Sequence, residues 1–413
     1  MTDTSLSSTL RAADQAFAEE RSADARALLE TATAQGDINA AYALAVAQAY
    51  GQGGNVDRSA AASTLQSIAP RLPAARRFLR IAMASSWLVG ANWSDAVTDL
   101  IDGAKNGSAS DQREVGFLLL ITGNEADANS VLLAAAKAQD PAAAIALIRM
   151  GISDPSTSDI RTKTLVRLVQ TRHPLADELV AIKTEGPPAP NSKEIDWTVI
   201  AQSLAELAFT ATAVSEIVPS ITAVSHQSAL HPAVCDYILT SGLRALQPST
   251  VVNRETGERS LDPHRKSLST TFAPHMQDLV THAIERRMTS LVDMSWSHAE
   301  RLVMLFYRPG EEYKPHVDYF SPDEWGSAAE LERGGQRVAT SLICLHPASA
   351  GGATVFPRFE ASWIGQSGDA MTFRNTDAAG QPEPMSLHQG EPVMSGWKAL
   401  LSLWIRERAS TPS

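Results

Sequence analysis

Two side chains that could bind a metal lie two residues apart in the stretch YKPHVDYF, residues 313–320. The aromatic and apolar residues around them predict a strand, and in a strand the side chains at positions i and i+2 point to the same face. We therefore expect the imidazole of His316 and the carboxylate of Asp318 to project together. Two ligands make half a site, so the remaining chemistry has to come from elsewhere in the chain.

A second imidazole is predicted from the context of His388, in MSLHQGEPV, which we interpret as a strand end followed by a glycine turn. Two imidazoles and one carboxylate match the facial triad that holds non-haem Fe(II) and leaves coordination positions open. An H-x-D spacing alone is weak evidence, since chance copies are common. Nine of the ten histidines follow residue 225, so a structural or surface role is expected for the others there. They are His226, His231, His264, His275, His282, His298 and His346.

Lys398 begins another informative stretch, WKALLSLWIRE, which has apolar residues on both faces of a predicted strand. Such a strand is buried on both sides, and an isolated buried ammonium is costly unless an anion accompanies it. A dicarboxylate cosubstrate would supply that anion. The alternative is a lysine at the strand entrance whose ammonium group extends into water.

The second half of the chain supplies the elements that must position these residues. Residues 231–246 and 276–292 have the spacing of helices, and from Arg301 onward short β-rich runs alternate with glycine-containing turns. These runs are RLVMLFY, RVATSLICL, ATVFP, DAMTFRN and WKALLSLWIRE. Many short strands after helices predict a β-sandwich or jelly roll with helices packed on one side.

The first half is rich in alanine and leucine at helical spacing. Small residues precede the predicted turns at Ala32, Ala69, Ala104 and Ala136, in steps of 37, 35 and 32 residues, which is the period of helix-pair repeats. This half resembles degenerate Sel1-like repeats, relatives of the tetratricopeptide repeats; an irregular helical bundle is the alternative. Stacked repeats form a curved solenoid whose concave face usually binds a protein or peptide.

A proline-rich stretch, KTEGPPAPNSKEID at residues 183–196, predicts a linker between the two halves. We therefore expect three segments: a helical-repeat domain at 1–182, the linker at 183–196, and a second domain at 197–413. The predicted fold class is multidomain, with an all-α first domain and an α+β second domain around a jelly-roll core.

Composition excludes several classes of protein. The net charge of −11 argues against a general nucleic-acid binder, because such proteins usually carry a basic face. Two cysteines, Cys235 and Cys344, are too few for a disulfide framework or a four-cysteine zinc site, and we expect two buried thiols. No signal-peptide pattern and no apolar run of about 18 residues is present, so we expect a cytoplasmic protein without a membrane span.

The order of motifs closely resembles the prolyl 4-hydroxylase branch of the Fe(II)/2-oxoglutarate dioxygenases. The resemblance covers about residues 215–408, from VPSITAVSHQSALHPAVCDYI and LDPHRKSLSTTF to the distal motifs. Those distal motifs are YRPGEEYKPHVDYF, GGQRVATSLICLHPASAGGATVFP, GDAMTFRN and SLHQGEPVMSGWKALLSLWIRE. The resemblance implies a double-stranded β-helix core.

The resemblance also implies roles for single residues. His316, Asp318 and His388 would be the iron ligands, and Lys398, ten residues after the distal histidine, would bind the 5-carboxylate of 2-oxoglutarate. The resemblance implies cosubstrate contacts for Tyr307 and Thr340. It implies aromatic pocket positions for Tyr313 and Trp404. Arg337 fits the family's GQR segment, where it would either touch substrate or brace the sheet. Gly351-Gly352 would form a tight turn.

Two departures from the family pattern concern the segment after the Thr340 strand and the substrate loop. Cys344 stands where the family has a tyrosine, and the segment YFSPDEWGSAAELERG carries no recognisable substrate signature.

The reaction that the resemblance implies is hydroxylation of an unactivated C–H bond, with a prolyl residue of a protein as the candidate position. It is coupled to oxidative decarboxylation of 2-oxoglutarate to succinate and CO2, with O2 as the second cosubstrate and ascorbate as the reductant.

Two alternatives stay open at this level. One is an interaction scaffold built on the repeats, with a vestigial oxygenase domain. The other is a zinc hydrolase that uses the same three ligands, although no general base such as the glutamate of H-E-x-x-H accompanies them. Binding of Fe(II) and dependence on 2-oxoglutarate distinguish these hypotheses from the dioxygenase.

Overall fold

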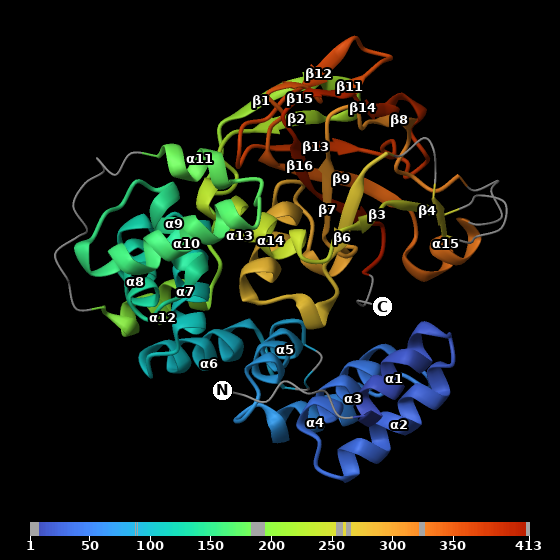
Figure 1. The fold of residues 1–413 in the computed structure, drawn as a ribbon. Helices are drawn as coiled ribbons and strands as arrows, with labels where there is room; N and C mark the ends of the chain where they lie inside the picture. The colour runs from blue at the N-terminus through green and yellow to red at the C-terminus, as the bar shows by residue number, and fades with distance from the viewer. Residues whose placement is uncertain are drawn as a thin grey trace.

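The structure is a computed structural model that describes residues 8–86, 88, 90–182, 195–252, 259–261, 266–321 and 327–409. Helices make up the first half and strands dominate the second (Figure 1). The predicted change from helices to strands is therefore confirmed. The predicted linker falls almost entirely outside the described residues, which resume at residue 195. No helix among the described residues is long and apolar enough to cross a membrane.

The helices of the first half occur in pairs at the predicted period. Their bounds are α1 (Ser8–Ala18), α2 (Ser22–Ala34), α3 (Ile38–Tyr50), α4 (Arg58–Ile68), α5 (Pro73–Ala84), α6 (Trp93–Lys105), α7 (Ala109–Ile121), α8 (Glu125–Lys137), α9 (Pro141–Arg149), α10 (Ser158–Gln170) and α11 (Ala176–Ala181). The predicted alanines lie in the last turn of the first helix, or directly after it in the case of Ala69, in four successive pairs, α2/α3 to α8/α9. The repeat of helix pairs is thus confirmed.

Capping residues fix where these helices begin and end. The carboxylate of Asp37 accepts hydrogen bonds from the backbone N–H groups of Asn39 and Ala40 at the start of α3. Asp140 caps α9 in the same way, and Pro141 occupies the first turn, where a missing N–H costs nothing. Gly51 ends α3 with φ 69°, a left-handed conformation that favours glycine.

Two larger β-sheets and two short ones form the described part of the second half. Its strands are β1 (Val214–Val218), β2 (Ala223–His226), β3 (Gln247–Pro248), β4 (Thr250–Val252), β5 (Arg259–Leu261), β6 (Leu268–Thr271), β7 (Val303–Tyr307), β8 (Tyr313–His316), β9 (Arg337–His346), β10 (Ala350–Gly351), β11 (Thr354–Phe356), β12 (Ala361–Trp363), β13 (Ala370–Arg374), β14 (His388–Gly390), β15 (Val393–Ser395) and β16 (Lys398–Arg406). An eight-stranded antiparallel sheet has the order β1-β2-β13-β9-β16-β7-β6-β3, and a four-stranded sheet has the order β12-β11-β14-β8. Two further two-stranded sheets, β10-β15 and β4-β5, complete the strands among the described residues.

The two faces of the large sheet belong to different cores. One face packs against α13 (Pro232–Leu243) and α14 (Leu279–Ser290) and joins a core that continues into the helical half. The other face and the small sheet enclose a second core that includes Tyr307, Phe356 and Leu400. This arrangement confirms the predicted jelly roll with helices on one side. Side chains that alternate along β16 therefore point in turn toward the helices and toward the jelly-roll interior.

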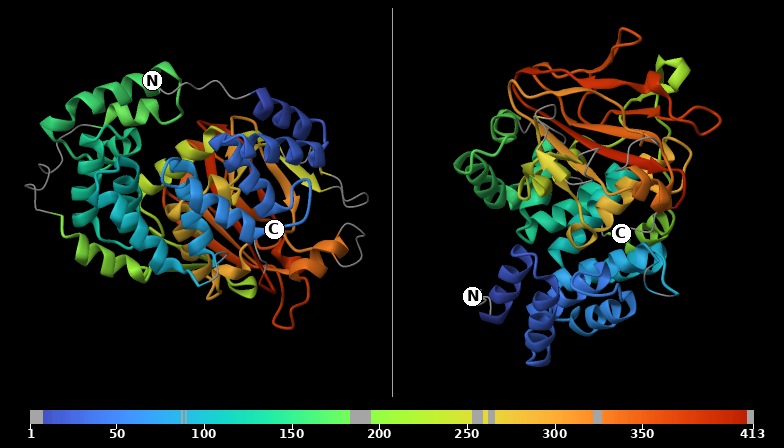
Figure 2. Two further views of the ribbon diagram at one scale, coloured as in Figure 1. Left: turned by 90° about the horizontal axis from the view of Figure 1, so that it is seen from below. Right: turned by 90° about the vertical axis from the view of Figure 1, so that its right-hand side faces the viewer.

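The helical half wraps around the helix-covered side of the second half (Figure 2). The second helix of each of three successive pairs contacts the second half of the chain. Helices α5 and α7 pack on α14, and α9 packs on α13. The ring of Phe117 on α7 stacks on Tyr237 of α13, with centroids 4.5 Å apart. After the linker, α12 (Trp197–Ala205) packs back on α6, where the indole N–H of Trp93 donates to Leu204. This inner surface of the helical half, formed by α5, α7 and α9, is thus covered by the chain itself.

Glu114 on α7 is a buried carboxyl group at this junction, 2% exposed. It accepts a hydrogen bond from the backbone N–H of Leu279, at the start of α14. Burial and the nearby carboxylate of Asp278 raise the pKa of Glu114 to about 7, against the opposing charges of Arg80 and Arg113. The folded chain therefore holds this proton more tightly than the unfolded chain does. The stability that the proton contributes is fully present below about pH 4.5 and is lost as the pH rises to about 7.

Glu114→Gln is expected to remove the loss of stability that accompanies ionisation of Glu114. At pH 8 the variant should have a free energy of unfolding about 1–3 kcal/mol higher than the wild type, and near pH 4.5 the two should nearly coincide. Denaturant unfolding at both pH values measures the difference. Asp159→Asn on α10, which changes an exposed ion pair with Lys163, is the control and should have little effect. A gain of the same size at both pH values would contradict the prediction.

Candidate metal centre

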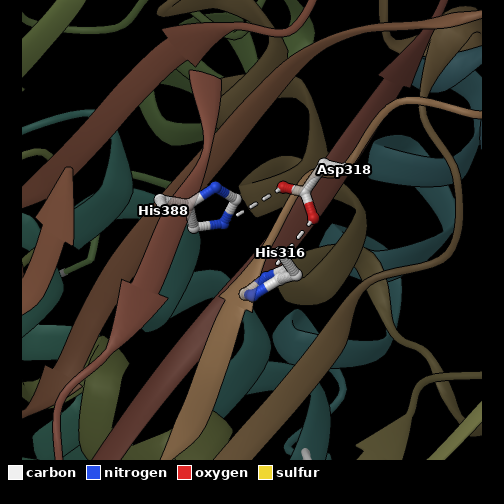
Figure 3. A group of neighbouring side chains, drawn as sticks. All are labelled: His316, Asp318 and His388. Atoms are coloured by element: carbon white, nitrogen blue, oxygen red, sulfur yellow. Dashed lines mark ion pairs between the residues drawn. The ribbon is translucent and has the colours of Figure 1, made fainter. Parts of the chain in front are cut away.

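His316, Asp318 and His388 come together at one end of the small sheet (Figure 3). His316 ends β8, His388 begins β14, and the two residues are paired directly across the ladder. Nε2 of His316 lies 3.8 Å from Oδ1 of Asp318, and Nε2 of His388 lies 3.7 Å from Oδ2. One candidate ligand atom from each residue lies within 4.8 Å of the others. The three residues singled out from the sequence are thus neighbours in space.

Local structure differs from the prediction at two of these residues. Strand β8 ends at His316, so Asp318 lies in a bend beyond it rather than within the strand. Its carboxylate still meets His316, because the bend turns the chain toward the large sheet, where Asp318 contacts Thr340 of β9. The prediction that His388 ends a strand is wrong, because this residue starts β14. Pairing of β14 with β8 places the residue opposite His316.

Both histidines are oriented by backbone carbonyls. Nδ1 of His316 lies 2.8 Å from the carbonyl oxygen of Lys314, and Nδ1 of His388 lies 3.0 Å from that of Ser386. A carbonyl oxygen can only accept a hydrogen bond, so each Nδ1 is the donor, and each Nε2 faces Asp318, where a metal ion could bind it. Metal-binding histidines are typically held in this way. The donor set therefore fits a divalent metal ion such as Fe(II).

The carboxylate of Asp318 is held from behind by a chain of polar groups. The hydroxyl of Thr340 on β9 donates to Oδ2 at 2.7 Å, and the side-chain amide of Asn375 donates to that hydroxyl at 2.8 Å. Burial by itself would raise the pKa of Asp318, but the neighbouring imidazoles of His388 and His316 lower it. The carboxylate is therefore ionised and fixed in direction. Sequence reasoning missed Asn375; its position just after the GDAMTFR strand was the available signal.

Lys398 lies inside the jelly roll, 6% exposed, so the alternative of an ammonium group that extends into water is wrong. Its Nζ donates to the carbonyl oxygen of Gly352 at 2.5 Å and lies 5.8 Å from the ring centroid of Tyr307, its partner across the ladder. Burial lowers the pKa of Lys398 to about 8. Gly352 has φ +71°, and a Cβ there would lie 3.3 Å from the lysine Cδ, so a side chain would be strained and would crowd Lys398.

A small pocket adjoins Lys398 and is lined by small and apolar groups, Cys344, Ala348, Trp363 and Leu400 among them. Both cysteines are buried thiols, as expected. Burial raises the pKa of the Cys344 thiol to about 12, so this thiol is neutral and adds no charge beside the ammonium group. A buried cation in apolar surroundings favours an anionic ligand, because a partner charge compensates for the lost water.

Aromatic and charged residues surround the metal ligands. Tyr313 stacks on the ring of His316 with centroids 3.5 Å apart. The guanidinium of Arg337 lies 4.2 Å from the ring centroid of Trp404 and forms a two-point ion pair with Glu300, at 2.7 and 2.8 Å. Arg337 is thus held by Glu300, a residue that sequence reasoning did not single out. The indole nitrogen of Trp404 is buried and has no hydrogen-bond partner among the described residues.

Comparison with known proteins finds a matching family model, similar relatives and similar solved structures. Residues 302–406 match the family model of the 2OG-Fe(II) oxygenase superfamily. The chain is 34% identical over 197 residues to prolyl 4-hydroxylase 1 of Arabidopsis thaliana, across 44% of this chain and 68% of that protein. The solved viral collagen prolyl hydroxylase vCPH from Paramecium Bursaria Chlorella virus-1, a 2OG complex, shares 23% identity at a TM-score of 0.36, across 45% of this chain and 95% of that one.

A Sel1 repeat protein from Oxalobacter formigenes is also similar, with 14% identity and a TM-score of 0.25, across 48% of this chain and 97% of that one. The chain spans about two thirds of the length of the plant prolyl 4-hydroxylases that it matches. The matched family region contains the His316, Asp318, His388 group and Lys398. The chain therefore belongs to the prolyl 4-hydroxylase family of 2OG-Fe(II) oxygenases.

Proposed function

We propose that His316, Asp318 and His388 hold Fe(II) and that the second half of the chain is a 2-oxoglutarate-dependent prolyl hydroxylase. The observation that carries this proposal is the meeting of two imidazoles and one braced carboxylate, with one candidate ligand atom from each within 4.8 Å of the others. Bound iron supplies the oxidising chemistry, in which 2-oxoglutarate is decarboxylated and one C–H bond of the substrate is hydroxylated. An interaction scaffold with a vestigial oxygenase domain would not need this donor set intact.

The surrounding residues have roles in binding and orientation. Lys398 would hold the 5-carboxylate of 2-oxoglutarate, since it is a buried cation next to the pocket described above. Tyr307 lies across the ladder from it and would line the same end. Thr340 would act mainly through Asp318, because its hydroxyl is already used there. The aromatic rings of Tyr313 and Trp404 would exclude water beside the metal ligands.

We further propose a peptidyl proline of a protein as the substrate and the chain division predicted above, 1–182, 183–196 and 197–413. The helical half would present that protein through surfaces other than the inner one, which α13 and α14 cover. Ascorbate as the reductant and a cytoplasmic location remain predictions from the sequence. A zinc hydrolase lacks a specific observation in its favour, because no glutamate of an H-E-x-x-H motif accompanies the three ligands.

The experiment that tests the proposal is anaerobic addition of Fe(II) and 2-oxoglutarate to the purified protein. A metal-to-ligand charge-transfer band in the visible is expected, followed on exposure to air by succinate release. Proline-containing peptides should then gain one oxygen atom by mass spectrometry, and release more succinate than the protein alone. A well-folded protein that gives no band would overturn the iron and 2-oxoglutarate assignment. A band with no peptide hydroxylated would overturn the substrate class alone.

A further inference from the structure

The helical half reaches the second half through a chain of charged side chains at one end of the large sheet. Arg149 at the end of α9 pairs with the buried carboxylate of Asp236 on α13, Nε to Oδ2 at 2.6 Å, and also with Glu178 on α11. Glu178 continues the chain, because its Oε2 lies 3.5 Å from Nε2 of His346. Arg149 and Glu178 belong to the helical half, and His346 is the last residue of β9.

His346 transmits this contact to the beginning of β16. Its ring stacks on the indole of Trp397, with centroids 3.6 Å apart and planes at 14°, and its Nδ1 lies 3.3 Å from the Trp397 carbonyl oxygen. The ladder skips Leu345 between the pairs Ala399↔His346 and Leu400↔Cys344, which is a bulge. A bulge redirects side chains, and here it lets His346 meet both Trp397 and the helical half.

Trp397 directly precedes Lys398, the first residue of β16, and an aromatic residue likewise precedes Tyr307 on the paired strand β7. The Trp397 indole also stacks on Phe306 of β7, with centroids 5.4 Å apart. Phe306 precedes Tyr307, which is paired with Lys398 across the ladder. Because successive strand residues face opposite sides, fixing Trp397 and Phe306 on the helical side fixes Lys398 and Tyr307 on the interior side.

We propose that Glu178 and His346 are positioning residues through which the helical half sets the place of Lys398, and so the affinity for 2-oxoglutarate. The inference rests on the proposed cosubstrate role of Lys398. The metal ligands lie on β8, its following bend and β14, none of which takes part in this chain of contacts. Loosening the contact should therefore weaken binding of 2-oxoglutarate and leave binding of the metal intact.

Glu178→Ala tests the proposal directly, and His346→Ala is the second variant because it also removes the stack on Trp397. The dissociation constant for 2-oxoglutarate, from anaerobic titration of the charge-transfer band, is expected to rise about 3- to 10-fold in Glu178→Ala and more in His346→Ala. The Glu178 side chain is 45% exposed, which limits the effect. The Fe(II) dissociation constant should stay unchanged. Asp159→Asn, on an exposed ion pair of the same half, is the matched control and should change neither constant.

Hydrogen exchange in the protein without metal gives a second readout. Amides at the start of β16, residues 398–401, should exchange faster in both variants than in the wild type and the control. Unchanged exchange with unchanged 2-oxoglutarate affinity would overturn the proposal, as would equal weakening of iron and 2-oxoglutarate, which indicates general destabilisation. If the wild type itself binds no 2-oxoglutarate, the proposed function is overturned even when the variants exchange faster. The cosubstrate role of this contact would then be overturned as well.

Discussion

His316→Ala is expected to abolish the charge-transfer band and to reduce turnover by about a thousandfold or more. The variant keeps only Asp318 and His388 as protein ligands, and two ligands cannot define the open face that the triad provides. Loss of a group that merely supports a metal ligand typically costs about 10–100-fold, so loss of a ligand itself should cost more. Anaerobic Fe(II) titration and succinate release measure the two effects.

The control for this variant is a histidine of the same half that is buried but lies outside the triad. His226 on β2 is 6% exposed, and its ring nitrogens contact the hydroxyls of Thr212 and Thr372. His226→Gln should bind Fe(II) as the wild type does, even if its unfolding temperature falls. Iron binding and turnover that survive in His316→Ala would show that the cluster is not the catalytic metal site.

Lys398→Ala is expected to weaken 2-oxoglutarate binding by about 100-fold or more while Fe(II) binding persists. Removing one partner of a buried ion pair costs about 3–5 kcal/mol, and each 1.4 kcal/mol corresponds to about a tenfold change in affinity. The variant should therefore need far more 2-oxoglutarate to produce the charge-transfer band. Equal affinity in the variant and the wild type would show that the dicarboxylate binds elsewhere.

The pH dependence of 2-oxoglutarate binding to the wild type provides a second check on the role of Lys398. Burial lowers the pKa of Lys398 to about 8, so part of the population is neutral at pH 8 before the dicarboxylate binds. The bound carboxylate favours the ammonium form, and the protein must take up a proton on binding. The dissociation constant should rise by up to about tenfold per pH unit above pH 8 in the wild type. In Lys398→Ala this dependence should be absent.

The sequence by itself was sufficient for the candidate chemistry, because ligand types, their spacing and local periodicity are all local properties. His316 and Asp318 are two residues apart, and even a bend in place of the predicted strand keeps such neighbours within reach of one metal ion. The helix pairs could be predicted for the same reason, since turn residues such as Asp37 and Asp140 act on the backbone next to them. The strands could be predicted because apolar runs and glycine turns alternate along the chain.

Tertiary structure alone decided what lies beside these residues. Asn375, Thr340 and Asp318 form one chain of hydrogen bonds because β13 pairs with β9, and no local pattern specifies which strands become neighbours. The same holds for Glu300 with Arg337, and for Glu178 with His346, which are 168 residues apart in the sequence and 3.5 Å apart in space. Such contacts depend on how two cores pack as wholes. The sequence thus determines the reactive groups, and the packing determines what holds them in place.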